Sequence, residues 1–162
     1  MSSLGLFHTG VSLLALGSGT YAFWRDGQIN PRNSLGKFYL GTMLVATLTA
    51  FGIFRHGTFG VGHMLSLVTL GILTTGILAS YSTTFGRLRD YVETISYSAS
   101  YLMLMVFATT ETLTRLPAAH PIAASQEAPI LGVVRLGLLI AFAVGLSFQI
   151  PRLQLAHNRK DA

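Results

Sequence analysis

Apolar residues occur in five long stretches that are separated by short polar segments. The stretches cover about 4–24, 35–54, 60–82, 91–116 and 129–150 of the 162 residues. Each has roughly the twenty residues that a helix needs to cross about 30 Å of hydrocarbon. Small residues recur inside them, for example Gly19 and Gly145, and are expected to let neighbouring helices pack closely. The pattern predicts an all-α, polytopic integral membrane bundle of about five transmembrane helices, forming one domain over 1–162.

The polar segments between these stretches carry turn and capping residues. The first of them contains Gly27, Asn30 and Pro31, and Ser34 is placed to cap the second helix. None of the connections is long enough to form a second folded domain. The sequence therefore excludes a large soluble catalytic domain within these residues.

Composition agrees with a membrane location. Hydrophobic residues make up 51% of the chain and charged residues only 10%, against about 25% charged in soluble domains. The chain has no cysteine, which excludes disulfides, thiolate metal sites, iron–sulfur clusters and cysteine nucleophiles.

The basic residues predict an orientation rather than a nucleic-acid partner. The net charge is +5, but lysine and arginine occur singly or in pairs at the ends of the apolar stretches. Eight of the eleven lie on one predicted side, at Arg25, Arg32, Lys37, Arg87, Arg89, Arg152, Arg159 and Lys160. Two, Arg55 and Arg115, lie on the other side. By the positive-inside rule the N-terminus is outside and the C-terminus cytoplasmic. We expect a multi-pass protein of a bacterial inner membrane, with the lipid bilayer, other membrane subunits or a second copy as partners and no nucleic acid.

Ionisable residues inside predicted spans are costly and indicate possible functional sites. At about 1.5 Å per residue, five of them lie within about 9 Å of the outer membrane boundary. We call this set the outer polar layer: His8, His63, Glu111, Arg115 and Arg135.

The fourth predicted helix has a polar stripe along one face. Its chemically notable members are Glu93, Tyr97, Tyr101 and Glu111, at spacings that fit a helical period. This helix is expected to be the most buried one, or to line a cavity. A transport or proton path along the stripe is one interpretation.

The outer polar layer has several further interpretations. Glu111 and Arg115 could form an ion pair that Arg135 joins, with both histidines bonded to hydroxyl groups and no ligand present. His8 and His63 could instead be axial ligands of haem b, with Arg115 and Arg135 near its propionates, or they could line a quinone site. His8, His63 and Glu111 could also bind copper or zinc. The candidate functions are a redox component of electron transport and a non-catalytic accessory subunit of a larger membrane complex; whether the protein is an enzyme stays open.

The order of residues resembles a family of small bacterial predicted membrane proteins, known as a domain of unknown function. The similarity rests on His8 in the first helix, on 35–39 (Leu-Gly-Lys-Phe-Tyr) opening the second, and on Arg115 closing the fourth. The family often has a histidine at the position of Arg32. The resemblance implies a membrane-embedded helical protein and transfers no activity.

Overall fold

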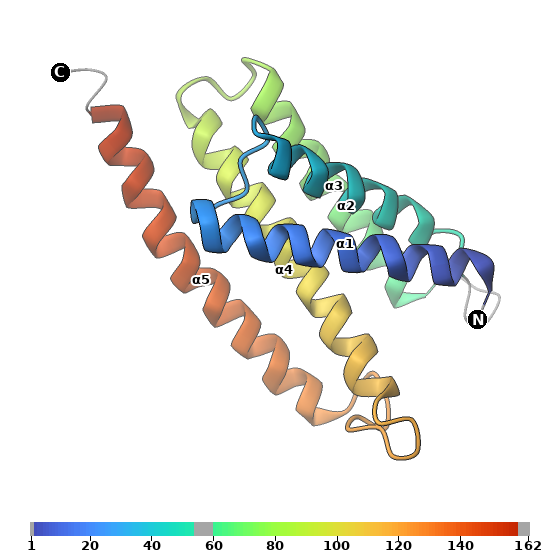
Figure 1. The fold of residues 1–162 in the computed structure, drawn as a ribbon. Coiled ribbons are helices and arrows are strands. Elements are labelled where there is room, and N and C mark those ends of the chain that lie inside the picture. The colour runs from blue at the N-terminus through green and yellow to red at the C-terminus, as the bar shows by residue number, and fades with distance from the viewer. Residues whose placement is uncertain (1, 54–59, 159–162) are drawn as a thin grey trace.

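The only regular secondary structure in the described part of the chain is helical, with no strand among its residues. A computed structural model describes residues 2–53 and 60–158 and is drawn in Figure 1. It contains five α-helices and one short 3₁₀ turn: α1 (Ser3–Asp26), α2 (Ser34–Ala50), α3 (Val61–Tyr81), η1 (Gly86–Leu88), α4 (Arg89–Arg115) and α5 (Pro129–Asn158). The predicted all-α class and the five helices are confirmed.

Two helix ends differ from the prediction by more than two residues. α2 ends at Ala50, whereas it was expected to reach Phe54, which lies outside the described residues together with Arg55. α5 continues to Asn158 through Pro151, whereas it was expected to end at Ile150. A proline removes one backbone donor and clashes with one carbonyl, so it can bend a helix without ending it.

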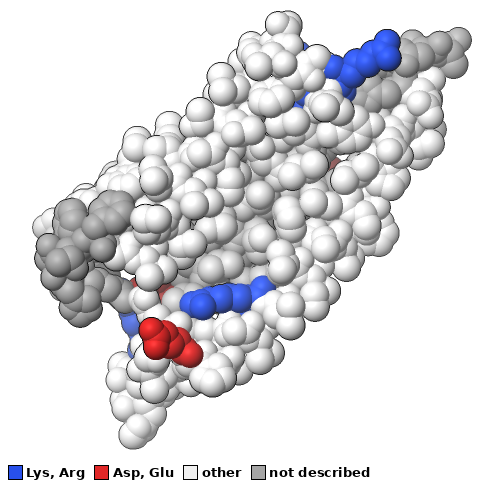
Figure 2. All heavy atoms as spheres, turned by 180° about the vertical axis from the view of Figure 1, so that it is seen from behind, with Lys and Arg blue, Asp and Glu red and all other residues white. Residues whose placement is uncertain are grey.

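Two helices of the described chain meet the requirements of a membrane span by length and composition. They are α3 and the portion Pro129–Leu155 of α5, and only 6% of the most apolar window of α5 is buried in the structure. Most of the surface seen in Figure 2 carries neither acidic nor basic side chains. A membrane location is supported by these two helices, while five spans and their orientation stay predictions.

α4 is the central helix of the bundle. It packs against α1, α3 and α5, whereas α5 packs against no other helix of the described chain. Figure 1 shows α5 as an outer helix running beside α4, on the side away from α2 and α3. α4 was expected to be the most buried helix or to line a cavity, and its residues Ser98 and Tyr101 line a cavity of about 390 Å³.

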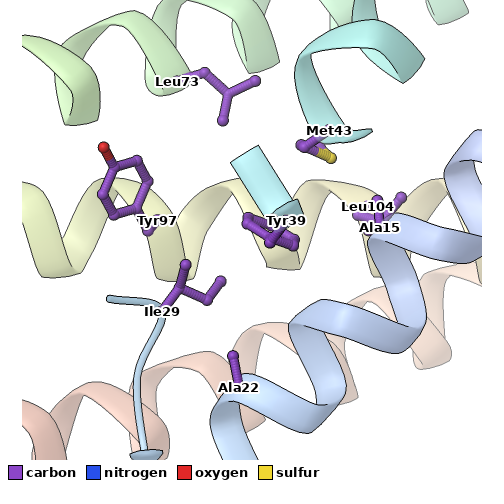
Figure 3. Packing of buried hydrophobic residues seen from close by; sticks show 8 residues of the cluster. All are labelled: Ala15, Ala22, Ile29, Tyr39, Met43, Leu73, Tyr97 and Leu104. Atoms are coloured by element: carbon purple, nitrogen blue, oxygen red, sulfur yellow. The ribbon is translucent and has the colours of Figure 1, made fainter. Parts of the chain in front are cut away.

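The buried core lies where α1, α2 and α3 meet α4. Figure 3 shows eight of its residues, which are Ala15, Ala22, Ile29, Tyr39, Met43, Leu73, Tyr97 and Leu104. Glycines allow the helices to approach at this core: a Cβ at Gly19 would lie 2.6 Å from the Tyr101 ring, and one at Gly76 would lie 2.7 Å from the Tyr97 ring. The predicted packing role of Gly19 is confirmed.

The connection between α1 and α2 is held by caps on both sides. Gly27 ends α1 with φ of 71°, a left-handed conformation that favours glycine. Asn33, rather than Ser34 as predicted, caps α2, because the Asn33 side chain accepts a hydrogen bond from the Gly36 N–H at 2.7 Å. Gly36 also lies directly against the connection, since a Cβ there would be 1.8 Å from the Asn30 carbonyl oxygen. These contacts fix the backbone around Arg32.

Candidate functional site

The strongest polar contact between distant segments joins Arg32 to Glu93. The Arg32 guanidinium donates to both Glu93 carboxylate oxygens, at 2.7 and 2.9 Å. These hydrogen bonds raise the pKa of Arg32. The Glu93 side chain is only 9% exposed, whereas that of Arg32 is 49% exposed. A buried carboxylate is stable when a fork of guanidinium donors satisfies it in this way, so Glu93 ties the start of α4 to the α1–α2 connection.

Hydroxyl groups of α4 bond to three other helices of the bundle. Tyr97 lies 2.7 Å from the Ser80 hydroxyl of α3, and Tyr101 lies 2.6 Å from the Thr20 hydroxyl of α1. One position before Tyr101, the Ser100 hydroxyl lies 2.9 Å from that of Tyr39 on α2. Because each hydroxyl bonds across a helix interface, these side chains of α4 hold helices together.

The N-terminal end of α4 also satisfies the carbonyls that end α3. Arg89 donates to the Ala79 carbonyl at 2.8 Å and to the Ser80 carbonyl. The last carbonyls of a helix have no partner within the helix, and a basic side chain there is also favoured by the helix dipole. The end of the bundle that contains Glu93 and Arg89 is therefore densely cross-linked.

Within the outer polar layer, both histidines contact local polar groups. The Nδ1 atom of His8 lies 3.0 Å from the Thr49 hydroxyl, which joins α1 to α2. His63 is buried, and its Nδ1 accepts a hydrogen bond from the Gly60 N–H at 3.2 Å, which caps α3. His8 thus contacts a hydroxyl group, as one interpretation expected, whereas the partner of the His63 Nδ1 atom is a backbone N–H rather than a hydroxyl.

The charged members of the outer polar layer come together only in part. Glu111 and Arg115 form the expected ion pair at 2.6 Å, with half-exposed side chains, and Glu111 lies within electrostatic reach of His8. Arg135 instead donates to the Gln126 carbonyl at 3.3 Å, and no carboxylate in the described part of the chain pairs with it. α5 therefore does not bring Arg135 to the Glu111–Arg115 pair.

The residues proposed as metal ligands do not form a metal site in this arrangement. Among residues 2–53 and 60–158, no three side chains of histidine, aspartate or glutamate are grouped closely enough to hold an ion. His8, His63 and Glu111 lie within these residues, so the copper or zinc hypothesis has no support from their geometry.

A groove opens on the side of the bundle, between α1 and α5. It has a volume of about 390 Å³, and α4 forms its floor. We call it the α1/α5 groove; its lining includes Phe23, Tyr101, Phe142, Gly145, Gln149 and Arg152. Its size is within the range of about 300–1,000 Å³ that is usual for small-molecule sites.

Gly145 provides open space in this groove. A Cβ there would meet no atom within 4 Å. The predicted role of Gly145 in close helix packing is thus wrong, because α5 lies away from α1 at this level. The wall opposite is aromatic, since the Phe23 and Tyr101 rings pack with centroids 5.0 Å apart.

The groove has a polar end near the cap of α1. Gln149 is buried there, accepts a hydrogen bond from Ser98 at 2.9 Å and donates one to the Gly27 carbonyl at 2.9 Å. Arg152 lies one turn further along α5, and its guanidinium is next to Gly27. An apolar groove with a polar end suits an amphipathic molecule.

Sequence reasoning named Tyr101, Gly145 and Arg152 in other roles, but it did not predict this groove or the partner of Glu93. One signal was present: Gln149 is the only residue with a carboxamide side chain in the apolar fifth stretch. Nothing in the sequence indicated that Arg32 pairs with Glu93. A basic residue in a connection between two predicted spans is already explained by the orientation of the protein in the membrane.

No protein-family model, curated protein or solved structure gives a significant match to this chain. The resemblance to a family of bacterial membrane proteins stays a prediction.

Proposed function

We propose that the protein is a five-span protein of the bacterial inner membrane with a binding, non-catalytic role, and that the α1/α5 groove holds an amphipathic molecule taken from the bilayer. It would act as an accessory component of a larger membrane system. The observation that carries the proposal is the groove itself, which opens sideways and has an apolar, aromatic body and a polar end.

Helix lengths support the five spans. α1, α2 and α4 have 24, 17 and 27 residues, and about 17–25 suffice to cross a bilayer. The polar side chains of α4 have partners inside the bundle, which is the condition for keeping them in a membrane. With the charge bias of the sequence, the groove's polar end faces the cytoplasm.

A binding role also agrees with the contacts that the ionisable residues make within the bundle. Glu93 is bonded to Arg32, Glu111 is bonded to Arg115, and His8 is bonded to Thr49. Each contact joins segments or stabilises a helix, and none requires a reaction. The redox hypothesis at His8 and His63 stays the rival, and its haem form predicts a Soret band that is lost in His8→Ala or His63→Ala.

The test is to block the groove and to measure bound membrane molecules. Gly145→Leu places a side chain in the open space, and Gly137→Leu is the matched control, because a Cβ at Gly137 also meets no atom within 4 Å but this residue does not line the groove. Both variants are purified from bacterial membranes in mild detergent, and bound lipids and quinones are counted by native mass spectrometry.

We expect the wild type and Gly137→Leu to retain a bound amphiphile and Gly145→Leu to lose most of it. Equal retention by the two variants would refute the groove as the binding site. A haem spectrum in the wild-type protein that depends on His8 and His63 would replace the binding proposal with the redox one.

A further inference from the structure

The polar end of the α1/α5 groove continues into a second, smaller cavity. This cavity of about 180 Å³ adjoins the groove through three shared residues, Gly27, Gln149 and Arg152, and adds Asp26, Gln28 and Leu153. The two cavities together form one site with an apolar body and a hydrogen-bonding end. The ligand's head is expected at this end, beside Arg152.

Among the described residues that line the two cavities, Arg152 is the basic one. Within residues 2–53 and 60–158, no carboxylate forms an ion pair with it. The nearby acidic residue, Asp26, is already engaged, because it accepts two hydrogen bonds from Arg25 at 2.7 Å and one from Asn33 at 2.9 Å. These bonds, led by that of Arg25, lower the pKa of Asp26. The site therefore offers a guanidinium to an anionic group.

The length of the groove matches one leaflet of a bilayer. Along α5 its lining begins at Ala141 and ends at Arg152, eleven positions later, which corresponds to about 16 Å of helix. Half of a hydrocarbon core of about 30 Å is close to this length. A partner transmembrane helix would need a groove through the whole core, whereas an acyl chain needs only one leaflet.

We infer that the α1/α5 groove binds an anionic phospholipid of the cytoplasmic leaflet, with its phosphate at Arg152 and one acyl chain along the aromatic wall. The inference rests on the proposed function and specifies its ligand. Guanidinium groups form paired hydrogen bonds with phosphate, and basic pockets between helices on the cytoplasmic side recognise anionic headgroups. An uncharged quinone would make no use of this charge.

The experiment compares two lipids that differ in headgroup charge. The full chain is placed in detergent with equal amounts of phosphatidylglycerol and phosphatidylcholine of the same acyl length, and bound lipid is counted by native mass spectrometry. We expect the wild type to prefer phosphatidylglycerol and Arg152→Gln to reduce that preference about fivefold, the value of one basic contact at a membrane surface. Arg152→Lys should retain part of it.

A matched control removes the same charge outside the groove. Arg87 is an exposed basic residue at the same predicted side of the membrane and does not line either cavity. Arg87→Gln should leave the preference unchanged. An equal loss in Arg87→Gln and Arg152→Gln would overturn the inference, because general surface charge would then explain it.

The outcomes separate the inference from the proposed function. If Gly145→Leu loses both lipids while Arg152→Gln keeps the full preference, the groove binds amphiphiles but Arg152 does not select them, and the inference is wrong. If Gly145→Leu keeps both lipids as Gly137→Leu does, both proposals fail. Full competition by glycerol phosphate without acyl chains would overturn the acyl-chain part of the inference.

Discussion

Arg32 and Glu93 lie sixty-one positions apart, and the Arg32 guanidinium donates two hydrogen bonds to the Glu93 carboxylate, at 2.7 and 2.9 Å. Glu93 is buried at the start of the central helix, and Arg32 reaches it from the connection between α1 and α2. The pair joins two parts of the chain that no local pattern connects. It also explains how a carboxylate can be retained within the bundle.

The first prediction concerns this pair. Arg32→Ala leaves the Glu93 carboxylate buried without its partner, so the free energy of unfolding in detergent should fall by about 2 kcal/mol, as for the loss of a hydrogen bond to a charged group. Glu93→Gln should cost less, because a neutral amide is cheaper to bury. Denaturant titration followed by circular dichroism measures both losses.

Arg25→Ala is the control for this prediction. Arg25 pairs with Asp26 through equally short hydrogen bonds, but it does so at the exposed end of α1, where ion pairs contribute little. Its removal should leave stability nearly unchanged. Equal stability of Arg32→Ala and Arg25→Ala would show that the Arg32–Glu93 pair does not stabilise the bundle.

The second prediction concerns the glycine that opens α2. A Cβ at Gly36 would lie 1.8 Å from the Asn30 carbonyl oxygen and 2.5 Å from its carbon, and these backbone atoms cannot move without shifting the connection. Gly36→Ala should lower the free energy of unfolding by about 3 kcal/mol, and the thermal unfolding midpoint should fall with it. Gly41→Ala in the same helix meets no atom within 4 Å and should be neutral or slightly stabilising. A stable Gly36→Ala variant would contradict the observed approach of the connection to α2.

The third prediction tests the α4 polar stripe as a structural element. Tyr97→Phe removes the hydroxyl that lies 2.7 Å from Ser80, while Ser80 keeps its own bond to the Gly76 carbonyl at 2.8 Å. The free energy of unfolding should fall by about 1 kcal/mol, the usual net contribution of one hydrogen bond. Tyr21→Phe, at an exposed position of α1, should have no such effect in the same denaturant titration. If the two variants behaved alike, the Tyr97 bond would make no net contribution.

The fourth prediction concerns the topology. Reporter fusions after Arg25 and after Arg89 should report a cytoplasmic location, and a fusion after Pro117 should report the outside, because positive residues are retained on the cytoplasmic side. Alkaline phosphatase and a fluorescent protein, each fused at these positions as a reporter, distinguish the two sides of the membrane. The reverse pattern would contradict the orientation, and the same side for all three would contradict five spans.

The sequence determined the positions of the helices within a few residues. Long apolar stretches and their polar boundaries are local properties, so 60–82 and 91–116 could be assigned to α3 (Val61–Tyr81) and α4 (Arg89–Arg115) without knowledge of packing. That α4 lines a cavity was one of two expectations drawn from its polar residues, because a polar helix needs partners inside the bundle or a cavity to face. The end of α5 was missed, since a proline such as Pro151 can lie inside a helix or end it.

Only the tertiary structure decided which polar residues meet. The sequence placed Glu93 on a face of its helix, but its partner Arg32 depends on how the α1–α2 connection lies over α4. Likewise, Gly145 fits close packing by its sequence, and only the distance between α1 and α5 makes it part of an open groove. Local composition fixes where helices form, whereas contacts between residues far apart in the chain depend on how the helices rotate and separate as they pack.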